Sequence, residues 1–313
     1  MNTKKIIIDC DPGQDDAICL LLAMASPQDF DILGITTVAG NVPLDLTQRN
    51  ARIICELANR PDIDVYAGCS RPMVRELVTA EKVHGNTGID GVDTYEPSHP
   101  LQTKHAVDYI IETLRVAEER TVTLVPIGPL TNIATAFDKD PSIVSRVEQI
   151  VLMGGAMREG GNYSPSAEFN ILVDPQAADI VFECGRPLTV LGLDVTHQAL
   201  AKKERIRRLR DVGNSAAIAT ADMLDFFNRH DTGKYGSLGA PLHDPCTIAY
   251  LLKPDLFTAK QCNISIETQS ELTMGHTAVD FWHVTDRPHN ANWVYGIDAD
   301  GFYALLTERL ARF

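Results

Sequence analysis

The 313-residue sequence predicts an α/β fold built on an open, mainly parallel or mixed sheet that is flanked by helices. Two observations predict it. Short apolar segments alternate with longer segments of helical periodicity up to about residue 200. The apolar segments, such as KKIIID at 4–9, carry unbroken hydrophobic runs, as expected for strands that are covered on both faces. We expect one domain over residues 1–313, with a helical elaboration around residues 200–250.

The expected elements follow one another in a regular order. Strands are expected at 4–9, 30–38, 64–68, 121–128, 147–155 and 188–195. Helices are expected between them, at 15–25, 44–59, 105–119, 130–137 and 174–183. The later part is expected to be helical over 200–229 and 243–252, to return to strands at 262–267, 279–285 and 292–297, and to end in a helix at 298–311. Ligands of such sheets bind beyond the carboxyl ends of the strands, so the polar motifs should lie there.

Charge and hydropathy exclude several classes of partner. The net charge is −14, which argues against sequence-independent binding to nucleic acid. The basic segment KKERIRRLR at 202–210 is a local exception, which we interpret as the solvated face of a helix. No segment approaches the roughly 18 apolar residues that a membrane span needs. The first residues do not match a signal peptide, so we expect a cytoplasmic protein.

The cysteines predict neither disulfides nor a zinc site. Their number is odd, no two of them form a CxxC motif, and several lie in apolar segments. We therefore expect free thiols, most of them buried, in a reducing compartment. The seven are Cys10, Cys19, Cys55, Cys69, Cys184, Cys246 and Cys262.

The segment IIIDCDPGQDD at 6–16 concentrates negative charge at the end of a core strand. It carries Asp9, Asp11, Asp15 and Asp16 within eight residues. One of these carboxylates could cap the following helix, and another could hydrogen-bond the loop, but capping needs only one. Carboxylates packed together resist joint ionisation, and a bound cation would resolve that conflict. Ligands that are all oxygen predict a hard cation. The spacing is not that of an EF-hand, and three carboxylates plus a carbonyl suit the loose oxygen shell of Ca²⁺.

Further polar residues follow the later strands. No GxGxxG or Walker A pattern occurs, so nucleotide phosphates are not indicated. Taken singly, each of these residues is more often an ordinary loop residue than a ligand. Pro126, Gly128 and Pro129 break a strand and could free the carbonyl of Ile127 for a metal. The other candidates are Asn41 in TTVAGN, His84 in VHGNTGIDG, and Asn162, Glu168 and Asn170 in GGNYSPSAEFN.

The segment GAPLHDPC at 239–246 supplies the strongest acid–base candidate. His243 stands beside a carboxylate and titrates near neutral pH. Asp244 could simply be the N-cap of a helix whose first residue is Pro245. The HDP motif alone does not decide whether Asp244 is only a helix cap or belongs with His243 to a catalytic site.

The ordered motifs resemble the inosine–uridine-type nucleoside hydrolases. DCDPGQDDA, TTVAGN, VHGNTG, VPIGPLTNIA, VLMGGA, AEFNI followed by DP and AA, and HDP occur in that family's order, over about residues 4–250. The resemblance implies a nucleoside hydrolase-like fold, Ca²⁺ at the bottom of a pocket, and hydrolysis of the N-glycosidic bond of ribonucleosides by a metal-activated water. It also implies a homotetramer or a homodimer, with a nucleoside as the small-molecule partner.

The resemblance also implies a role for each matching residue. Asp11, Asp16, Asp244 and the carbonyl of Ile127 would hold calcium, and Asp11 would also be the general base. Asp9 would support the cluster without binding the metal. His243 would be the general acid that protonates the leaving base, with His84 near that base. Residues that contact ribose or order the water would be Asp15, Asn41, Met153, Asn162, Glu168 and Asn170.

The base preference is expected to be broad or to lean to pyrimidines. The segment 228–244 resembles the pyrimidine-preferring group, in which a tyrosine matches Tyr235. Asp231 stands where some relatives have glutamine, and an acid cannot donate an amide hydrogen bond to a uracil carbonyl. His230 could compensate or be a surface histidine. Compared with some members of the family, this chain has one extra residue within 157–161, just before Asn162.

Two other functions are compatible with parts of the pattern. A haloacid-dehalogenase-type phosphohydrolase also places DxD after its first strand, as Asp9 and Asp11 do here, but needs a later lysine, a second acidic pair and Mg²⁺. A calcium-dependent nucleoside-binding protein without activity would need neither the base Asp11 nor the acid His243.

Overall fold

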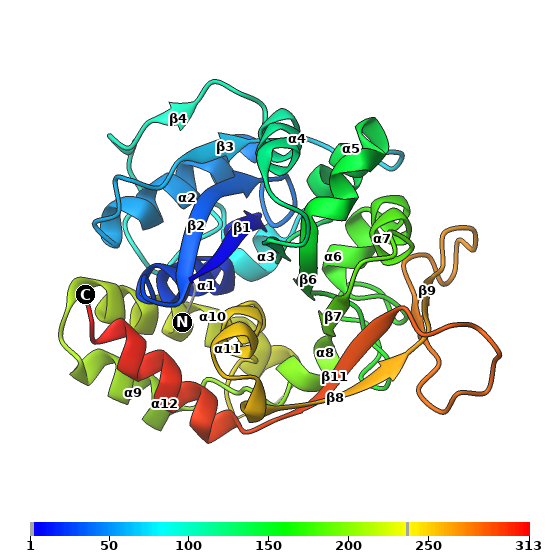
Figure 1. The fold of residues 1–313 in the computed structure, drawn as a ribbon. Helices are drawn as coiled ribbons and strands as arrows, with labels where there is room; N and C mark the ends of the chain where they lie inside the picture. The colour runs from blue at the N-terminus through cyan, green and yellow to red at the C-terminus, as the bar shows by residue number, and fades with distance from the viewer. Residues whose placement is uncertain (1–2, 236–237) are drawn as a thin grey trace.

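The computed structural model describes residues 3–235 and 238–313, with side chains described except at 230–235. The described chain forms a nine-stranded sheet of order β4-β3-β2-β1-β5-β6-β7-β11-β8 (Figure 1). All neighbouring strands run parallel except β8, which is antiparallel to β11. The prediction of an open, mainly parallel sheet is therefore confirmed.

The strands of this sheet are β1 (Lys4–Cys10), β2 (Phe30–Thr37), β3 (Val65–Ala67), β4 (Leu101–Gln102), β5 (Val122–Pro126), β6 (Val147–Met153), β7 (Leu188–Leu191), β8 (Phe257–Cys262) and β11 (Ala291–Ile297). A separate antiparallel pair consists of β9 (Ile264–Ile266) and β10 (Thr277–Val279). The first six expected strands are all present.

The α-helices are α1 (Gln14–Met24), α2 (Leu44–Leu57), α3 (Glu81–His84), α4 (Ala106–Val116), α5 (Thr131–Lys139), α6 (Phe169–Val173), α7 (Pro175–Phe182), α8 (Leu193–Thr196), α9 (Lys203–Asp211), α10 (Ser215–Tyr235), α11 (Pro245–Leu252) and α12 (Ala299–Leu310). Two 3₁₀ turns span Pro141–Arg146 and Pro254–Leu256. Every expected helix exists, but the expected helical region at 200–229 is two helices, α9 and α10, separated near Gly213. The short elements α3, α6, α8 and β4 were not expected, and neither was strand β8 before Cys262.

Three expected strands are wrong in extent or continuity. The strand expected at 188–195 ends at Leu191, because Gly192 is the N-cap of α8. Of the strand expected at 279–285, only Val279 belongs to β10. Asp280 explains this, since its carboxylate accepts hydrogen bonds from the backbone N–H groups of Val284 and Thr285 and holds the chain in a turn. The strand expected at 262–267 is divided into the end of β8 and β9.

Both faces of the sheet are buried, as the unbroken apolar strands predict. Ile6 and Ile8 of β1 pack into one hydrophobic cluster, and Ile7 between them packs into the other. The second cluster lies under α4, α5 and α7, while the first lies under α1, α2 and the helical region of α9–α12 (Figure 1). This arrangement explains why side chains along β1 are apolar at consecutive positions.

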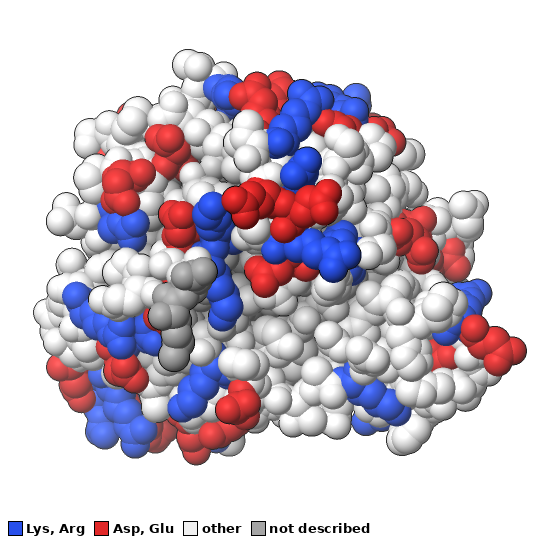
Figure 2. Space-filling view, viewed as in Figure 1, with Lys and Arg blue, Asp and Glu red and all other residues white. Residues whose placement is uncertain are grey.

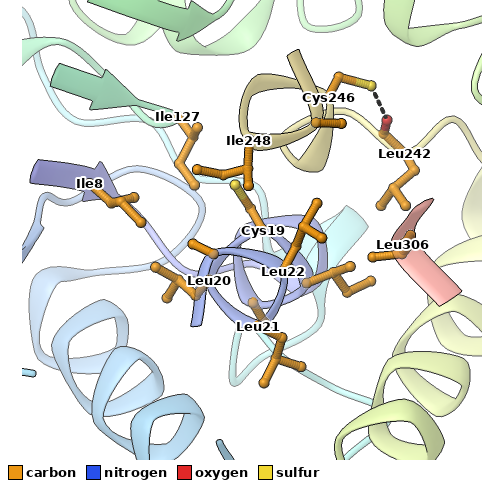
Figure 3. Close-up of a cluster of buried hydrophobic side chains, with 14 of the residues drawn as sticks. Ile8, Cys19, Leu20, Leu21, Leu22, Ile127, Leu242, Cys246, Ile248 and Leu306 are labelled. Atoms are coloured by element: carbon orange, nitrogen blue, oxygen red, sulfur yellow. Dashed lines mark hydrogen bonds between the residues drawn. The ribbon is translucent and has the colours of Figure 1, made fainter. Parts of the chain in front are cut away.

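Helix α1 is buried along its entire length. Its residues from Gln14 to Met24 are all inaccessible or nearly so. Figure 3 shows Cys19, Leu20, Leu21 and Leu22 of α1 surrounded by side chains of β1, α11 and α12. The first turn of α1 carries Asp15 and Asp16, so the fold places two carboxylates at the start of its most enclosed helix.

The sheet has a topological switch point between β1 and β5. From β1, the chain adds β2, β3 and β4 on one side, and later β5, β6 and β7 on the other. The loops that leave β1 and β5 therefore diverge and leave a crevice at their carboxyl ends, where open α/β sheets bind ligands. The polar motifs after these two strands begin at Asp11 and Ile127.

Asn132, in the first turn of α5, joins the ends of β1 and β2 to the loop after β3. Its Nδ2 donates to Asp9 Oδ1 at 2.8 Å and to the carbonyl oxygen of Thr37 at 3.0 Å. Its Oδ1 accepts from the backbone N–H of Cys69 at 2.8 Å. The side chain is fully buried, so water cannot replace these bonds if it is removed.

Replacing Asn132 with alanine should therefore lower the free energy of unfolding by about 2–4 kcal/mol, because each lost buried hydrogen bond contributes ~1 kcal/mol and leaves an unpaired group. Urea unfolding followed by circular dichroism measures this. Glu119→Ala, at an exposed position, is the control and should change stability by less than ~0.5 kcal/mol. Equal stability of the two variants would contradict the role given to Asn132.

Candidate active site

A pocket opens at the carboxyl ends of the central strands. Loops after β1, β2, β5 and β6 form its floor, and α3, α10 and the segment before α11 contribute to its walls. Its lining consists of Asp15, Asn41, Ala80, Val83, His84, Ile127, Met153, Asn162, Tyr163, Glu168, Phe169, Asn170, His197, Phe227, Pro241, His243 and Asp244. No lysine or arginine is among the described residues that line it.

Three carboxylates converge at the bottom of the pocket. Asp15 and Asp16 come from the first turn of α1, and Asp244 is the N-cap residue of α11. One carboxylate oxygen of each lies within 4.8 Å of the other two, and all three are buried. Asp244 stands at the expected cap position, but its side chain makes no capping hydrogen bond and faces the cluster. The catalytic interpretation of the HDP motif gains support from this geometry.

Asp16 accepts three hydrogen bonds from protein groups, which take the place of water around its buried carboxylate. Its Oδ1 accepts from the backbone N–H of Asp11, and its Oδ2 accepts from that of Gly13, both at 3.0 Å. The Nδ2 of Asn41 donates to the same Oδ2 at 3.1 Å. Burial still raises the pKa of Asp16 to about 6, although these donors pull it down.

Asp11 faces Asp16 from the loop after β1. Its Oδ2 accepts from the backbone N–H of Asn41 at 2.7 Å. Burial raises the pKa of Asp11 well above its usual range, and the negative charges of Asp16 and Asp15 raise it further. The same two causes, burial first and the neighbouring charges second, raise the pKa of Asp15 to about 8 and that of Asp244 well above normal. The protein alone therefore does not stabilise the joint ionisation of this cluster.

The residues present fit a hard divalent cation. Asp11 Oδ1 and Asp15 Oδ1 are buried, and neither has a hydrogen-bond partner among the described residues. Orphaned carboxylate oxygens in a buried site are costly unless a cation or a proton compensates them. The donor set is entirely oxygen, which suits Ca²⁺ or Mg²⁺ better than softer metals.

Two glycines make room for the Asp11 carboxylate. A Cβ atom at Gly40 would lie 2.1 Å from Oδ2 of Asp11, and one at Gly128 would lie 2.3 Å from its Oδ1. Any side chain at either position would collide with the carboxylate. The glycine of TTVAGN and that of VPIGPLTN are therefore required by the close approach of two loops to Asp11.

The carbonyl of Ile127 lies at the pocket floor and is already engaged. Asn170 Nδ2 donates to it at 2.8 Å and also to the carbonyl of Met153 at 3.2 Å. A carbonyl oxygen has two lone pairs, so this bond leaves one for a cation. Asn170 thus fixes the ends of β5 and β6 relative to each other.

Glu168 also lines the pocket, at the start of α6. As N-cap of α6 it accepts from the backbone N–H of Asn170 at 3.0 Å, and it accepts from that of Gly155 at the same distance. Burial raises the pKa of Glu168 to about 7. Asn162 Oδ1 accepts from the N–H of Phe169 at 2.9 Å, which holds the loop before α6 against the pocket.

Two histidines of the pocket are held through their Nδ1 atoms. Thr196 Oγ1 lies 2.7 Å from His243 Nδ1. Gln14 Oε1 lies 2.7 Å from His84 Nδ1, and Gln14 Nε2 donates to the carbonyls of His84 and Asp90. Burial lowers the pKa of His243 well below normal, and positive charge on His197 and His84 would lower it further.

The structure brings together most of the residues that the sequence suggested. Nine of them line the pocket: Asp15, Asn41, His84, Met153, Asn162, Glu168, Asn170, His243 and Asp244; the carbonyl of Ile127 joins them. Asp11 and Asp16 lie directly behind, bonded to the backbone and to Asn41. Asp9 does not line the pocket; its Oδ1 accepts from Thr36 and Asn132. The side chains of His230, Asp231 and Tyr235 lie outside the described residues.

Several residues of the site were missed from the sequence. Gln14 and Thr196 touch the two histidines, while His197, Tyr163 and Phe227 line the pocket. Thr196 follows the carboxyl end of β7, and that position was the available signal. Phe227 lies on α10, directly before the segment 228–244, and an apolar residue in a helix gives no local sign of a binding site.

The surface agrees with a small-molecule site. On the face in Figure 2, acidic and basic side chains are interspersed, and no continuous basic stripe crosses it. In the described part of the chain, no helix has the length and apolar character needed to cross a membrane.

Comparisons with known proteins find similar sequences and structures over nearly the whole chain. The profile of the inosine-uridine preferring nucleoside hydrolases matches residues 6–304. The chain is 51% identical over 310 residues to the pyrimidine-specific ribonucleoside hydrolase RihA of Shewanella sp. (strain MR-7), covering 99% of this chain and 96% of that protein. A plant nucleoside hydrolase structure superposes with a TM-score of 0.92 at 31% identity, over 99% of both chains. A purine-preferring ribonucleoside hydrolase from Gardnerella vaginalis gives 0.91 at 34%, over 98% of both.

The close approach of Gly128 to Asp11 predicts a specific defect. Gly128→Ala places a methyl group against Oδ1 and should displace the carboxylate, so that the binding of a divalent cation at this cluster, probed with Ca²⁺, weakens by ~10- to 100-fold. Isothermal titration calorimetry of the metal-free protein measures this. Gly296→Ala is the matched control, because its Cβ would make an ordinary contact of 3.4 Å with Thr258. Unchanged Ca²⁺ affinity in Gly128→Ala would contradict the placement of Asp11 at a cation site.

Proposed function

The chain belongs to the inosine-uridine preferring nucleoside hydrolase family, and we propose that it uses Ca²⁺ to hydrolyse ribonucleosides to ribose and the free base. Membership makes it an enzyme that cleaves N-glycosidic bonds. The observation that carries the calcium proposal is the buried cluster of Asp15, Asp16 and Asp244 at the bottom of the pocket. The orphaned oxygens of Asp11 and Asp15 support it.

Asp11, Asp16, Asp244 and the carbonyl of Ile127 would hold the cation, and Asp15 lies close enough to share in it. When bound, the cation would hold ribose hydroxyls and lower the pKa of a water molecule in contact with it. Asp9 supports the site by its bonds to Thr36 and Asn132.

Asp11 is the proposed general base. Its Oδ2 is fixed by the backbone N–H of Asn41, while Oδ1 has no donor among the described residues and can accept a proton from the attacking water. The bond to Asn41 keeps the carboxylate from rotating away.

The ribose would lie between the aspartates and the opposite wall. Asp15 and Asn41 would contact its hydroxyls from the floor, while Asn162, Glu168 and Asn170 would hold it from the segment around α6, with Met153 packed below. Departure of the base gives the sugar oxocarbenium character, and these carboxylates would stabilise the positive charge. The absence of lysine and arginine from the described lining favours an uncharged nucleoside over a phosphorylated one.

The base would lie toward the histidines. His243 is the proposed general acid. Burial lowers the pKa of its ring well below the value near neutrality expected from the sequence, so the ring is mostly neutral in the free enzyme, and this role requires it to gain a proton when the nucleoside binds. His84, stacked on Phe227 with ring centroids 5.5 Å apart, would line the same end, where Tyr163 adds a second aromatic side chain. Such side chains accept the flat face of either kind of base.

A preference for pyrimidine nucleosides, or a broad one, is part of the proposal. Similarity to a pyrimidine-specific relative at 51% identity supports it, while a purine-preferring structure at 34% identity keeps a broad preference in view. Tyr235 would contact the base. A homotetramer or homodimer and a cytoplasmic location remain predictions.

Two alternatives are less well supported. The family match over residues 6–304 argues against a haloacid-dehalogenase-type phosphohydrolase, which also needs a lysine that the described lining lacks. A calcium-dependent binding protein without activity would have no use for a buried base and acid. Phosphate release from p-nitrophenyl phosphate tests the first, and unchanged nucleoside after long incubation with Ca²⁺ would indicate the second.

The deciding experiment measures ribose release from uridine, cytidine, inosine, adenosine and guanosine, each with and without a chelator. We expect release that the chelator abolishes and Ca²⁺ restores, and the fastest turnover with a pyrimidine nucleoside. Restoration by Mg²⁺ but not by Ca²⁺ would overturn the identity of the cation. Full activity in the chelator would overturn the metal site.

Asp11→Asn should lower kcat by ~10²–10⁴-fold, because it removes the proposed base. Calcium affinity measured by calorimetry separates loss of the base from loss of the metal, since kcat should remain low at saturating Ca²⁺. Asp222→Asn is the control, because Asp222 pairs with Arg210 on the surface of α10. Near-normal turnover by Asp11→Asn would refute the assignment.

A further inference from the structure

We propose that Thr196 is a positioning residue for His243: its hydroxyl group occupies Nδ1, so that the proton for the leaving base is delivered from Nε2. This inference rests on the proposed function. The Oγ1 of Thr196 lies 2.7 Å from Nδ1, within the range of a short hydrogen bond. The comparisons assign no role to this residue.

Thr196 is held rigidly. It ends α8, the short helix after β7, and its own backbone N–H donates to Gly192 O at 3.2 Å. The start of α8 is tied to the loop after β6, because Leu193 N–H donates to Gly155 O at 2.9 Å. The side chain is fully buried, so no bulk water competes for its hydroxyl group. A rigid, buried hydroxyl can fix the orientation of a ring.

The segment that carries His243 is bound to the segment that follows Thr196. Leu242 N–H donates to Ala199 O at 3.0 Å, and Ala201 N–H donates to Ala240 O at 2.7 Å. Leu200 and Pro241 form an isolated antiparallel bridge between these two bonds. The backbone therefore holds the threonine and the histidine in register, independently of their side chains.

An imidazole has two nitrogen atoms that can carry a proton, so the hydrogen bond between Thr196 and Nδ1 determines which nitrogen is left for the substrate. A ring that is free to rotate could present either one to the substrate. In the protonated ring, Nδ1–H donates to Thr196 Oγ1 and the Nε2 proton is the one available for transfer.

The only reactants in the cleavage are the nucleoside, one water molecule and the side chains of His243 and Asp11. As the bond between ribose C1′ and the base nitrogen breaks, its electron pair goes to the base. The Nε2 proton of His243 moves to the base, and the ring becomes neutral with its remaining hydrogen on Nδ1, still bonded to Thr196. Water adds to C1′, and its proton goes to Asp11.

The other neighbour of the ring is less suited to this role. The ring of His197 lies with its centroid 5.9 Å from that of His243, and its Nδ1 is paired with Glu159 Oε2 at 2.9 Å. Its contact is between rings at an interplanar angle of 55°, whereas Thr196 contacts a ring nitrogen directly.

The test compares Thr196→Val, which keeps the shape and removes the hydroxyl group, with Thr196→Ser, which keeps the hydroxyl group. Each variant is assayed with saturating Ca²⁺ on the best nucleoside and on p-nitrophenyl β-D-ribofuranoside. The leaving group of the second substrate is a stable anion that needs no proton. The ratio of the two kcat values does not depend on how much of a variant is folded, so reduced stability cannot imitate the result.

Thr196→Val should lower kcat on the nucleoside by ~10- to 100-fold, a part of the ~10²–10⁴-fold that a general acid supplies. Its kcat on the nitrophenyl riboside should stay that of the wild type, and Thr196→Ser should recover most of the nucleoside activity. Equal losses on both substrates would mean a structural role and would overturn the proposal, as would a nucleoside rate unaffected by Thr196→Val. Wild-type protein inactive on both substrates would overturn the proposed function itself.

Discussion

Repulsion among buried carboxylates is the constraint on which the rest of this structure depends. Asp15, Asp16 and Asp244 meet with their oxygens within 4.8 Å, and Asp11 lies behind them. The fold offers them the N-terminal ends of α1 and α11, whose free N–H groups favour anions. It also gives Asp16 three hydrogen-bond donors. These contributions do not compensate for burial, because the pKa of every member is still raised.

The topology explains how such a cluster can be assembled at all. Asp11 and Ile127 follow neighbouring strands, β1 and β5, at the point where the order of the sheet reverses. Asp244 arrives more than 220 residues later, on the helix that packs against α1. The enclosure of α1 by apolar side chains (Figure 3) fixes its first turn, and this keeps the carboxylates close despite their repulsion. Hydrophobic packing thus stabilises an arrangement that electrostatics alone would disperse.

The sequence predicted those parts of the molecule whose signals are local. Four aspartates follow an apolar strand, and burying so many negative charges together is unfavourable. The sequence alone therefore predicted a cation site there. The position of Thr196 after β7 was a signal, but the contacts of Thr196 and Gln14 were not predictable, because they are made with His243 and His84, 47 and 70 positions away. The strand expected at 279–285 does not form beyond Val279, and here the reason is local. The carboxylate of Asp280 accepts hydrogen bonds from two backbone N–H groups and turns the segment away from the sheet.

Two of the pocket histidines, His84 and His243, show how neutral side chains can complete a charged site. Gln14 Nε2 donates to two carbonyls, so its Oε1 is the atom that faces His84, and His84 Nδ1 must be the donor in that bond. Thr196 engages the same nitrogen of His243. Both rings are therefore held through Nδ1 by uncharged partners from different elements. A carboxylate in either place would have stabilised a permanent imidazolium and added charge to a crowded site. A hydroxyl and an amide instead orient the rings and leave their protonation free to change during turnover.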